Sequence, residues 1–368
     1  MRTTIFLKLV LILIFVTGCS FNSSHRLLSD SHNDDLFDEF PELASNLKQE
    51  HMEGTFDGTI LISRGEDILF RQSYGYADRV RKIANSSEII SDIGSISKTF
   101  TAAAILILEQ QGKLKTSDTL AKFYPSVPRD KKDITIEQLL VHSSGFDNFH
   151  SKTDFDLMTR KEAEDIILSM PLRFKAEEKV AYSNAAYTLL AAIVERVSGQ
   201  LFQEFIYESI LRPLKLSNTG FYKDSSIPKE MLANGYGGND EGQTTFEKGL
   251  TWALVGAGGV VASIEDMKKW FESLSKNTTL GTRLKERVFK SINSKWTLGN
   301  WTTRNIKETS VIQMGGSTEY GYTALIQYLP KKDLLVILLF NSYSSKYSNA
   351  THHMISRNVI LPILKLHE

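Results

Sequence analysis

The sequence contains a single cysteine among its 368 residues, Cys19, so no disulfide bond can form within the chain. Neither sign of charge is in excess, because 43 basic residues are balanced by 43 acidic ones. We therefore do not expect a surface that binds nucleic acid. The histidines show no metal-ligand spacing, and His352 and His353 are adjacent on a predicted helix, where they cannot face one metal together. Neither a metal nor an organic cofactor is expected.

The hydrophobic run near the N-terminus, residues 9–16, is too short to span a bilayer, which takes ~20 apolar residues. Its basic start and the small residues that follow it are typical of a secretory signal. Residues 16–19, VTGC, resemble the lipobox of bacterial lipoproteins, which implies cleavage before Cys19 and acylation of its thiol. Residues 1–18 are then a signal peptide, and the mature protein is exported and lipid-anchored to a bacterial membrane, on its periplasmic or cell-surface side. The alternative is an incidental cysteine in an uncleaved signal.

The remainder of the chain divides into a tether and one folded domain. Residues 19–35 are rich in Ser, Asn, Asp and His and lack periodicity, which predicts a flexible tether. Helical patterns are found at residues 36–50, 96–111, 134–142, 162–169, 185–197, 263–274 and 349–366. Patterns typical of β-strands are found at residues 57–64, 67–76, 309–314, 322–329 and 334–340.

Strands at both ends of the domain, with helices between them, predict an α+β fold. We expect one antiparallel sheet flanked by the N- and C-terminal helices and interrupted by a mostly helical subdomain. The domain spans residues 36–368, with the sheet part at about 36–90 and 300–368 and the helical part at about 91–299. A ligand site is expected in the cleft between the two parts.

Residues 92–100, DIGSISKTF, allow two interpretations. A P-loop needs four residues between its first glycine and a Gly-Lys-Ser/Thr triplet, and here Ser97 precedes Lys98, so the segment does not match that pattern. The alternative is a serine nucleophile, Ser95, with a lysine one helical turn later on the same face. A partly desolvated lysine has a lowered pKa and can help to activate the hydroxyl. The spacing alone is weak evidence, because Ser-x-x-Lys also starts at Ser45, Ser226 and Ser273; only Ser95 opens a helix that is apolar nearly all round.

Five segments along the chain make the interpretation of Ser95 more specific. They are residues 56–78, 94–114 (GSISKTFTAAAILILEQQGKL), 134–146 (ITIEQLLVHSSGF), 181–199 (AYSNAAYTLLAAIVERVSG) and 256–270 (GAGGVVASIEDMKKW). Together they resemble the serine β-lactamase-like family. That family includes class C β-lactamases, penicillin-binding D-alanyl-D-alanine carboxypeptidases and β-lactamase-like esterases. The resemblance covers the chain from roughly residue 50 onward.

The resemblance implies roles for four residues. Ser95 is the acylated nucleophile, Lys98 its proton partner and Tyr182 a second proton-transfer group, with a phenol pKa that the Lys98 cation would lower. Asn184 hydrogen-bonds the substrate amide or the lysine. His142 has a structural role in the family. A second Tyr-Ser-Asn triplet at residues 347–349 follows the last strand, where the family has no such motif, and is interpreted as coincidence.

The third family motif, Lys or His, a small residue and then Gly, has one candidate here, Met314-Gly315-Gly316-Ser317. The glycines let a substrate backbone lie along the strand, and the N–H of Ser317 joins that of Ser95 in an oxyanion hole. Met314 departs from the pattern, since a thioether carries no charge and cannot attract a substrate carboxylate. Efficient β-lactam hydrolysis is therefore not expected.

Two functions follow from these patterns. The first is an exported serine hydrolase that forms an acyl-enzyme on Ser95 and acts on a peptide, a β-lactam or a small ester or amide. The second is a catalytically impaired member of the family that binds a cell-wall fragment or a protein partner in the same cleft. Met314 favours the second function, and the presence of Ser95, Lys98, Tyr182 and Asn184 favours the first.

Overall fold

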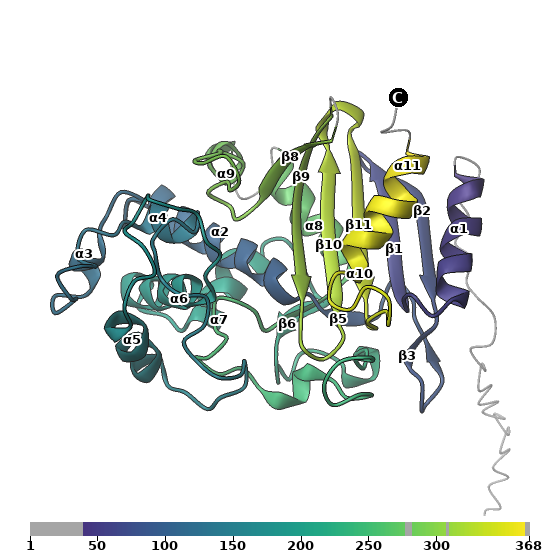
Figure 1. The fold of residues 1–368 in the computed structure, drawn as a ribbon, viewed down its shortest axis with the longest axis horizontal. Coiled ribbons are helices and arrows are strands. Elements are labelled where there is room, and N and C mark those ends of the chain that lie inside the picture. Colours follow the sequence, from purple (N-terminus) through teal and green to yellow (C-terminus); the bar gives the residue numbers. More distant parts are fainter. Residues whose placement is uncertain (1–39, 277–281, 307–308, 365–368) are drawn as a thin grey trace, which may run out of the picture. The chain divides into compact units, whose positions relative to one another are not determined.

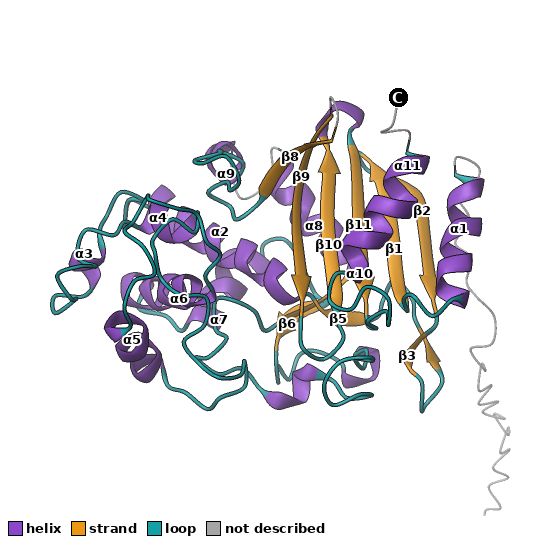
Figure 2. Cartoon of the chain, viewed as in Figure 1, coloured by secondary structure: helices purple, strands orange, loops and turns teal. Residues whose placement is uncertain are grey.

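The computed structural model describes residues 40–276, 282–306 and 309–364. Its main sheet has six antiparallel strands in the order β2-β1-β11-β10-β9-β8 (Figures 1 and 2). The strands are β1 (Gly58–Arg64), β2 (Asp67–Tyr74), β8 (Thr302–Ile306), β9 (Thr309–Ser317), β10 (Thr323–Leu329) and β11 (Leu334–Phe340). Strand β1 pairs with β11 along its whole length, so the two ends of the domain meet in the middle of the sheet.

Helices cover both faces of this sheet (Figure 1). Every residue of β11 is buried, which explains its uninterrupted apolar sequence, LLVILLF. One face packs against three helices from the ends of the domain, α1 (Pro41–Met52), α10 (Thr351–Ile355) and α11 (Leu361–Ile363). The other face packs against α8 (Ile264–Ser275), which contacts β1 and β11.

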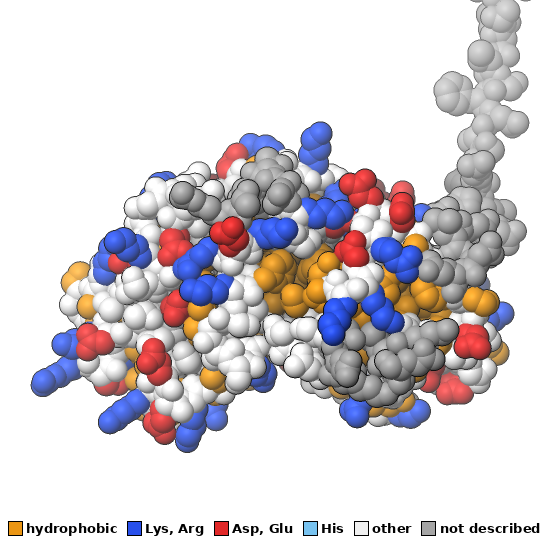
Figure 3. Space-filling model, turned by 90° about the horizontal axis from the view of Figure 1, so that it is seen from above, with side chains coloured by type: hydrophobic (Ala, Val, Ile, Leu, Met, Phe, Trp, Pro, Cys, Tyr) orange, Lys and Arg blue, Asp and Glu red, His pale blue; other side chains and the backbone are white. Residues whose placement is uncertain are grey.

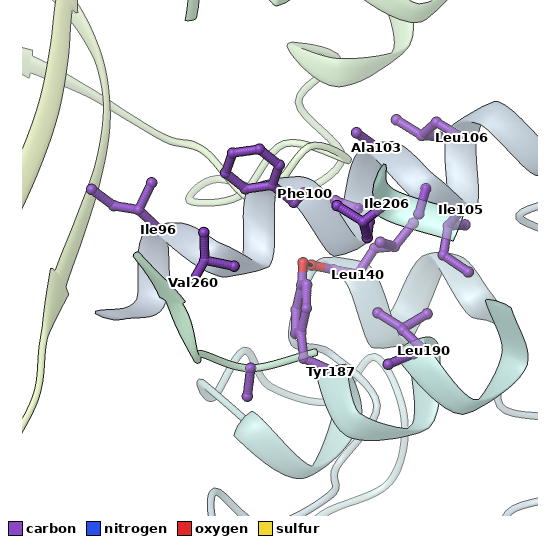
Figure 4. Packing of buried hydrophobic residues seen from close by; sticks show 14 of the residues in the cluster. Ile96, Phe100, Ala103, Ile105, Leu106, Leu140, Tyr187, Leu190, Ile206 and Val260 are labelled. Carbon is purple, nitrogen blue, oxygen red and sulfur yellow. Dashed lines mark hydrogen bonds between the residues drawn. The ribbon is translucent and has the colours of Figure 1, made fainter. Parts of the chain in front are cut away.

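The helical part has its own core around α2 (Ser97–Gln110), in which every residue from Ser97 to Leu108 is buried. Figure 4 shows Ile105 of α2 near Leu190 of α6 (Asn184–Ser198), whereas Phe100 lies on another side of α2 and stacks on Trp270 at a ring-centroid distance of 4.2 Å. The Tyr187 hydroxyl donates to the Leu140 carbonyl at 2.8 Å. The other helices are α3 (Leu120–Phe123), α4 (Ile136–Leu140), α5 (Arg160–Ser169), α7 (Phe202–Ile206) and α9 (Thr282–Val288).

The structure confirms the predicted α+β class, but the segment from 91 to 299 is less purely helical than the sequence predicts. A three-stranded sheet in the order β5-β7-β6 lies within it or at its edge, built from Ile90–Asp92, Val260–Ser263 and Thr219–Phe221. A small hairpin, β3 (Tyr76–Asp78) with β4 (Ile83–Ala84), precedes it. These strands are too short for an alternating pattern to be recognised, and strand β8 was likewise not predicted.

The predicted N-terminal helix begins at Pro41, and the predicted helix at 349–366 is divided into α10, a π-helical turn at Ser356–Ile360 and α11. The signal peptide at 1–18, the tether at 19–35 and Cys19 lie outside the described residues. Among the helices of the described part, none has the length and apolar character needed to cross a membrane. Charged side chains of both signs are interspersed over the face seen in Figure 3, as expected from the balanced composition.

Candidate active site

Ser95 lies on a tight 3-10 turn, Gly94–Ile96, that leads directly into α2. It is the only residue between Ile90 and Leu108 that is not buried, so its side chain alone is partly exposed while its neighbours pack in the core. Gly94 takes a positive φ of 51°, which favours glycine. The buried Asp92 carboxylate fixes the turn by accepting from the Gly94 N–H at 2.9 Å.

Lys98 follows one turn later and is completely buried. Its Nζ donates to the Ala257 carbonyl at 2.5 Å and lies 3.2 Å from the Ser95 Oγ. Burial lowers the pKa of Lys98 to about 7, because the charged form is poorly solvated there. The amine is therefore neutral in a large fraction of molecules near neutral pH and can take up a proton from Ser95.

Tyr182 is the third member of this cluster, since its hydroxyl donates to the Ser95 Oγ at 2.7 Å. The Lys98 Nζ lies 4.9 Å from the centre of the Tyr182 ring. The prediction that Lys98 lowers the Tyr182 pKa is wrong, because burial of the phenol raises its pKa above the usual value. At rest, Tyr182 is a protonated phenol, suited to donate a proton.

The Tyr-Ser-Asn segment is held by a buried histidine. His142 accepts the Ser183 N–H at its Nδ1, at 3.2 Å, and its Nε2 donates to the Asn300 Oδ1 at 2.9 Å. Burial lowers the pKa of His142 to about 3, so it stays neutral. With both ring nitrogens engaged and neither contacting Ser95, His142 has the structural position expected. Asn184 begins α6 and faces the same cavity as Ser95.

The Met314–Ser317 segment forms the end of β9, next to the serine turn. Met314 is buried, and its Sδ accepts weakly from the Asn300 Nδ2 at 3.8 Å, which links it through Asn300 to His142. A Cβ on Gly316 would come within 2.1 Å of the Ile93 carbonyl and 2.8 Å of the Ser95 N, so glycine is required there by the close approach of strand and turn. A Cβ on Gly315 would approach the His352 Nε2 to 2.9 Å. Close packing therefore favours glycine at both positions, a constraint that the sequence alone did not show.

Two cavities adjoin Ser95, and both are lined by Tyr182 and Ser317. The first, of about 440 Å³, contains Asn184 and side chains from the loop around residues 148–155 and the turn at 317–320. The second, of about 560 Å³, contains Met314, Gly315 and Gly316, and its charged residues include Lys295 and Arg304. The Ser95 hydroxyl is therefore accessible from two sides.

Of the site residues predicted in the domain, Ser95, Tyr182, Asn184 and Met314–Ser317 line these cavities, and Lys98 lies buried beside Ser95. The structure adds others. Asn349, from the triplet interpreted as coincidence, lines both cavities, a position that the sequence did not predict. Asn148, Asp154 and Glu319 line the first cavity and were not found from the sequence. No motif marks them, because they reach the cavity from loops far apart in the chain.

Several known proteins resemble this chain in sequence or in fold. A sequence model of the family described as Beta-lactamase matches residues 34–356. A penicillin-binding protein of Bacillus subtilis (strain 168) is 27% identical over 320 residues, covering 80% of this chain and 70% of that protein. Teichoic acid D-alanine hydrolase of Staphylococcus aureus is 26% identical over 240 residues, covering 65% of this chain and only 59% of that protein. The D-amino acid amidase of Ochrobactrum anthropi SV3, solved with D-phenylalanine, shares the fold, with a TM-score of 0.77 at 19% identity over 89% of this chain and 99% of that one.

Proposed function

The chain belongs to the beta-lactamase family of serine hydrolases, and we propose that it works by forming an acyl-enzyme on Ser95. The observation that carries this proposal is the contact of one partly exposed hydroxyl with two proton-transfer groups. The Ser95 Oγ lies 3.2 Å from the Lys98 Nζ and 2.7 Å from the Tyr182 hydroxyl, at the wall of two cavities. A serine hydroxyl is a weak nucleophile unless a base takes its proton.

The proposed acylation moves one proton around this group. The neutral Lys98 amine takes the proton of the Ser95 hydroxyl while Oγ attacks the substrate carbonyl. The backbone N–H groups of Ser95 and Ser317 stabilise the resulting oxyanion. When the bond to the leaving group breaks, Tyr182 gives its proton to that group and regains one from the Lys98 ammonium. Asn184 hydrogen-bonds the substrate beside the scissile bond. Water then attacks the acyl-enzyme, and Ser95 recovers its proton.

Mass spectrometry after exposure to a fluorophosphonate, and separately to a penicillin, tests this proposal. We expect a fluorophosphonate adduct on Ser95. Penicillin labelling with slow release would support a carboxypeptidase-like activity, whereas fast turnover would support β-lactam hydrolysis. If neither probe labels Ser95, the second function is favoured, in which an impaired site binds a cell-wall fragment or a protein partner. Met314 is the feature that supports this alternative.

The substrate is a peptide, ester or amide whose recognition does not depend on a cation at position 314. Met314 offers no charge beside Ser95, so the free carboxylate of penicillins and D-alanyl-D-alanine peptides would have to pair with Lys295 or Arg304 in the second cavity. The names of two similar proteins, a teichoic acid D-alanine hydrolase and a D-amino acid amidase, describe acyl groups that are amino acids. An amino-acyl ester or amide therefore fits this cleft better than a β-lactam.

Met314→Lys is expected to raise kcat/KM about 10-fold for substrates that carry a free carboxylate, because a charge-assisted hydrogen bond becomes available in the second cavity. Steady-state kinetics on one substrate with its carboxylate free and then amidated measure the effect. Met314→Leu, which fills similar space without charge, is the matched control and should show no gain. Unchanged kinetics in the lysine variant would show that β9 does not face the substrate carboxylate.

Export and lipid anchoring are part of the same proposal and rest on the VTGC segment. Cleavage before Cys19 and acylation of its thiol would place the domain beside a bacterial membrane, at the end of a 16-residue stretch from 20 to 35. We expect the full-length protein to partition into detergent, and the Cys19→Ala variant to lose this behaviour. A Cys19→Ala protein that stays in the membrane fraction would count against the anchor.

A further inference from the structure

The first cavity contains two carboxylates beside the nucleophile, those of Asp154 and Glu319. Asp154 is half-buried and makes no hydrogen bond or ion pair with any residue of the described ranges. Burial and the nearby charge of Glu319 raise the pKa of Asp154 to about 6. Within the described ranges, the Glu319 carboxylate has one side-chain hydrogen bond: its Oε2 accepts from the Asn239 Nδ2 at 3.1 Å. Two carboxylates that repel each other across a cavity are stabilised by a cation placed between them.

Aromatic rings line the same cavity as these carboxylates. Phe155 follows Asp154 in the chain and Tyr320 follows Glu319, and their ring centroids lie 5.2 Å apart in an edge-to-face contact. Tyr222 lies 6.1 Å from Phe155 in a stacked arrangement. All three rings line the cavity. The faces of aromatic rings attract ammonium groups, so rings and carboxylates together form the chemistry of an ammonium site.

The lysines nearby do not fill this site. Lys98 is held by the Ala257 carbonyl and Ser95. Lys248, which lies 5.3 Å from the Tyr320 ring centre, pairs with Asp240 at 2.7 Å. Lys152 is exposed where it lines the cavity, and no ion pair joins it to Asp154 within the described residues. The second cavity carries the opposite charge, since Lys295 and Arg304 line it. A cationic part of a substrate is therefore favoured in the first cavity.

We propose that the acyl group transferred to Ser95 carries a free ammonium group, bound by the Asp154 and Glu319 carboxylates among the aromatic rings of the first cavity. The proposal rests on the acyl-enzyme function and names its substrate class: esters or amides of amino acids whose amine is unblocked. The ammonium holds the acyl group beside Ser95 while the leaving group extends into the second cavity. Asp154 and Glu319 are then specificity-determining residues.

Competition for Ser95 tests this class without requiring turnover. The rate of fluorophosphonate labelling is measured with increasing D-alaninamide and, in parallel, N-acetyl-D-alaninamide, which differs only in its blocked amine. We expect the free amine to protect Ser95 at concentrations at least 10-fold lower than the acetylated compound. Asp154→Asn should weaken protection by the amine roughly 10- to 100-fold, the range for a hydrogen bond to a charged group, and leave the weak protection by the acetylated compound unchanged. Glu319→Gln should act in the same direction.

Labelling without competitor is the internal control, because it reports an intact Ser95 in each variant. Protection is expressed relative to each variant's own labelling rate, since the Asp154 charge also raises the pKa of Lys98. Asp133→Asn removes an exposed carboxylate that lines neither cavity and should protect like the parent protein. Equal protection by both compounds, protection by neither, or amine protection unaffected by Asp154→Asn would overturn the proposal while leaving the hydrolase function in place. Absence of labelling in the parent protein would instead remove the function on which it rests.

Discussion

Ser95→Ala is expected to lower kcat/KM by roughly 10⁴- to 10⁶-fold, the range seen when a serine hydrolase loses its nucleophile. The loss is large because the Ser95 Oγ is the partly exposed hydroxyl that the Lys98 Nζ contacts, at 3.2 Å. Lys98 and Tyr182 would keep their positions, since Lys98 is held by the Ala257 carbonyl and Tyr182 packs against His142 at a ring-centroid distance of 4.7 Å. The variant should therefore fold normally and still bind ligands in both cavities.

Ser45→Ala is the matched control, because Ser45 also has a lysine three residues later but lies exposed on α1 and lines neither cavity. It should retain full activity and full fluorophosphonate labelling. The measurement is kcat/KM on a small ester, with labelling followed by intact-mass spectrometry. Residual activity of Ser95→Ala above a hundredth of the parent rate, or an adduct on another serine, would place the nucleophile elsewhere.

The sequence is sufficient for those parts of the site that lie close together in the chain. Ser95 and Lys98 are one helical turn apart, and an apolar helix follows them, so local spacing predicts both their proximity and the burial of the lysine. The terminal strands could be predicted because β11 is a continuous apolar run. The short strands of the β5-β7-β6 sheet could not, since three or four residues carry too little pattern.

The parts of the site that depend on long-range contacts were not predictable. Asp154 and Glu319 are 165 positions apart in the numbering and meet only because a loop of the helical part faces the turn after β9. The link from His142 through Asn300 to Met314 likewise joins three segments. The direction of the Tyr182 pKa was predicted wrongly because the spacing shows a nearby lysine but not the burial of the phenol, which outweighs it.

Lys98→Met is expected to reduce kcat/KM by about 10²- to 10⁴-fold, the contribution of a positioned general base. In the parent protein the base must be neutral, and the pKa of Lys98 is about 7. Activity should therefore rise as pH rises through about 7, as measured by the pH dependence of kcat/KM, which reports the free enzyme. Lys131→Met removes a second buried lysine, whose Nζ pairs with Asp130 at 2.8 Å away from both cavities, and should keep the parent pH profile. A parent profile that is flat between pH 6 and 8 would exclude Lys98 as the base.

The same substitution is expected to stabilise the fold while it removes activity. Burial lowers the folded-state pKa of Lys98 from 10.5 to about 7, so the unfolded chain binds a proton more tightly than the folded protein does. The buried lysine therefore lowers the free energy of unfolding. This cost in stability is fully present below pH 7 and disappears as pH rises to about 10. At 1.36 kcal/mol per pKa unit this cost is roughly 3–5 kcal/mol, reduced by about 1–3 kcal/mol when methionine leaves the Ala257 carbonyl without its donor. Urea unfolding at pH 7 should show Lys98→Met more stable than the parent, with the difference shrinking toward pH 10. A variant less stable than the parent at pH 7, or a difference that grows with pH, would mean that Lys98 is held as an ammonium and that its base role requires another proton acceptor.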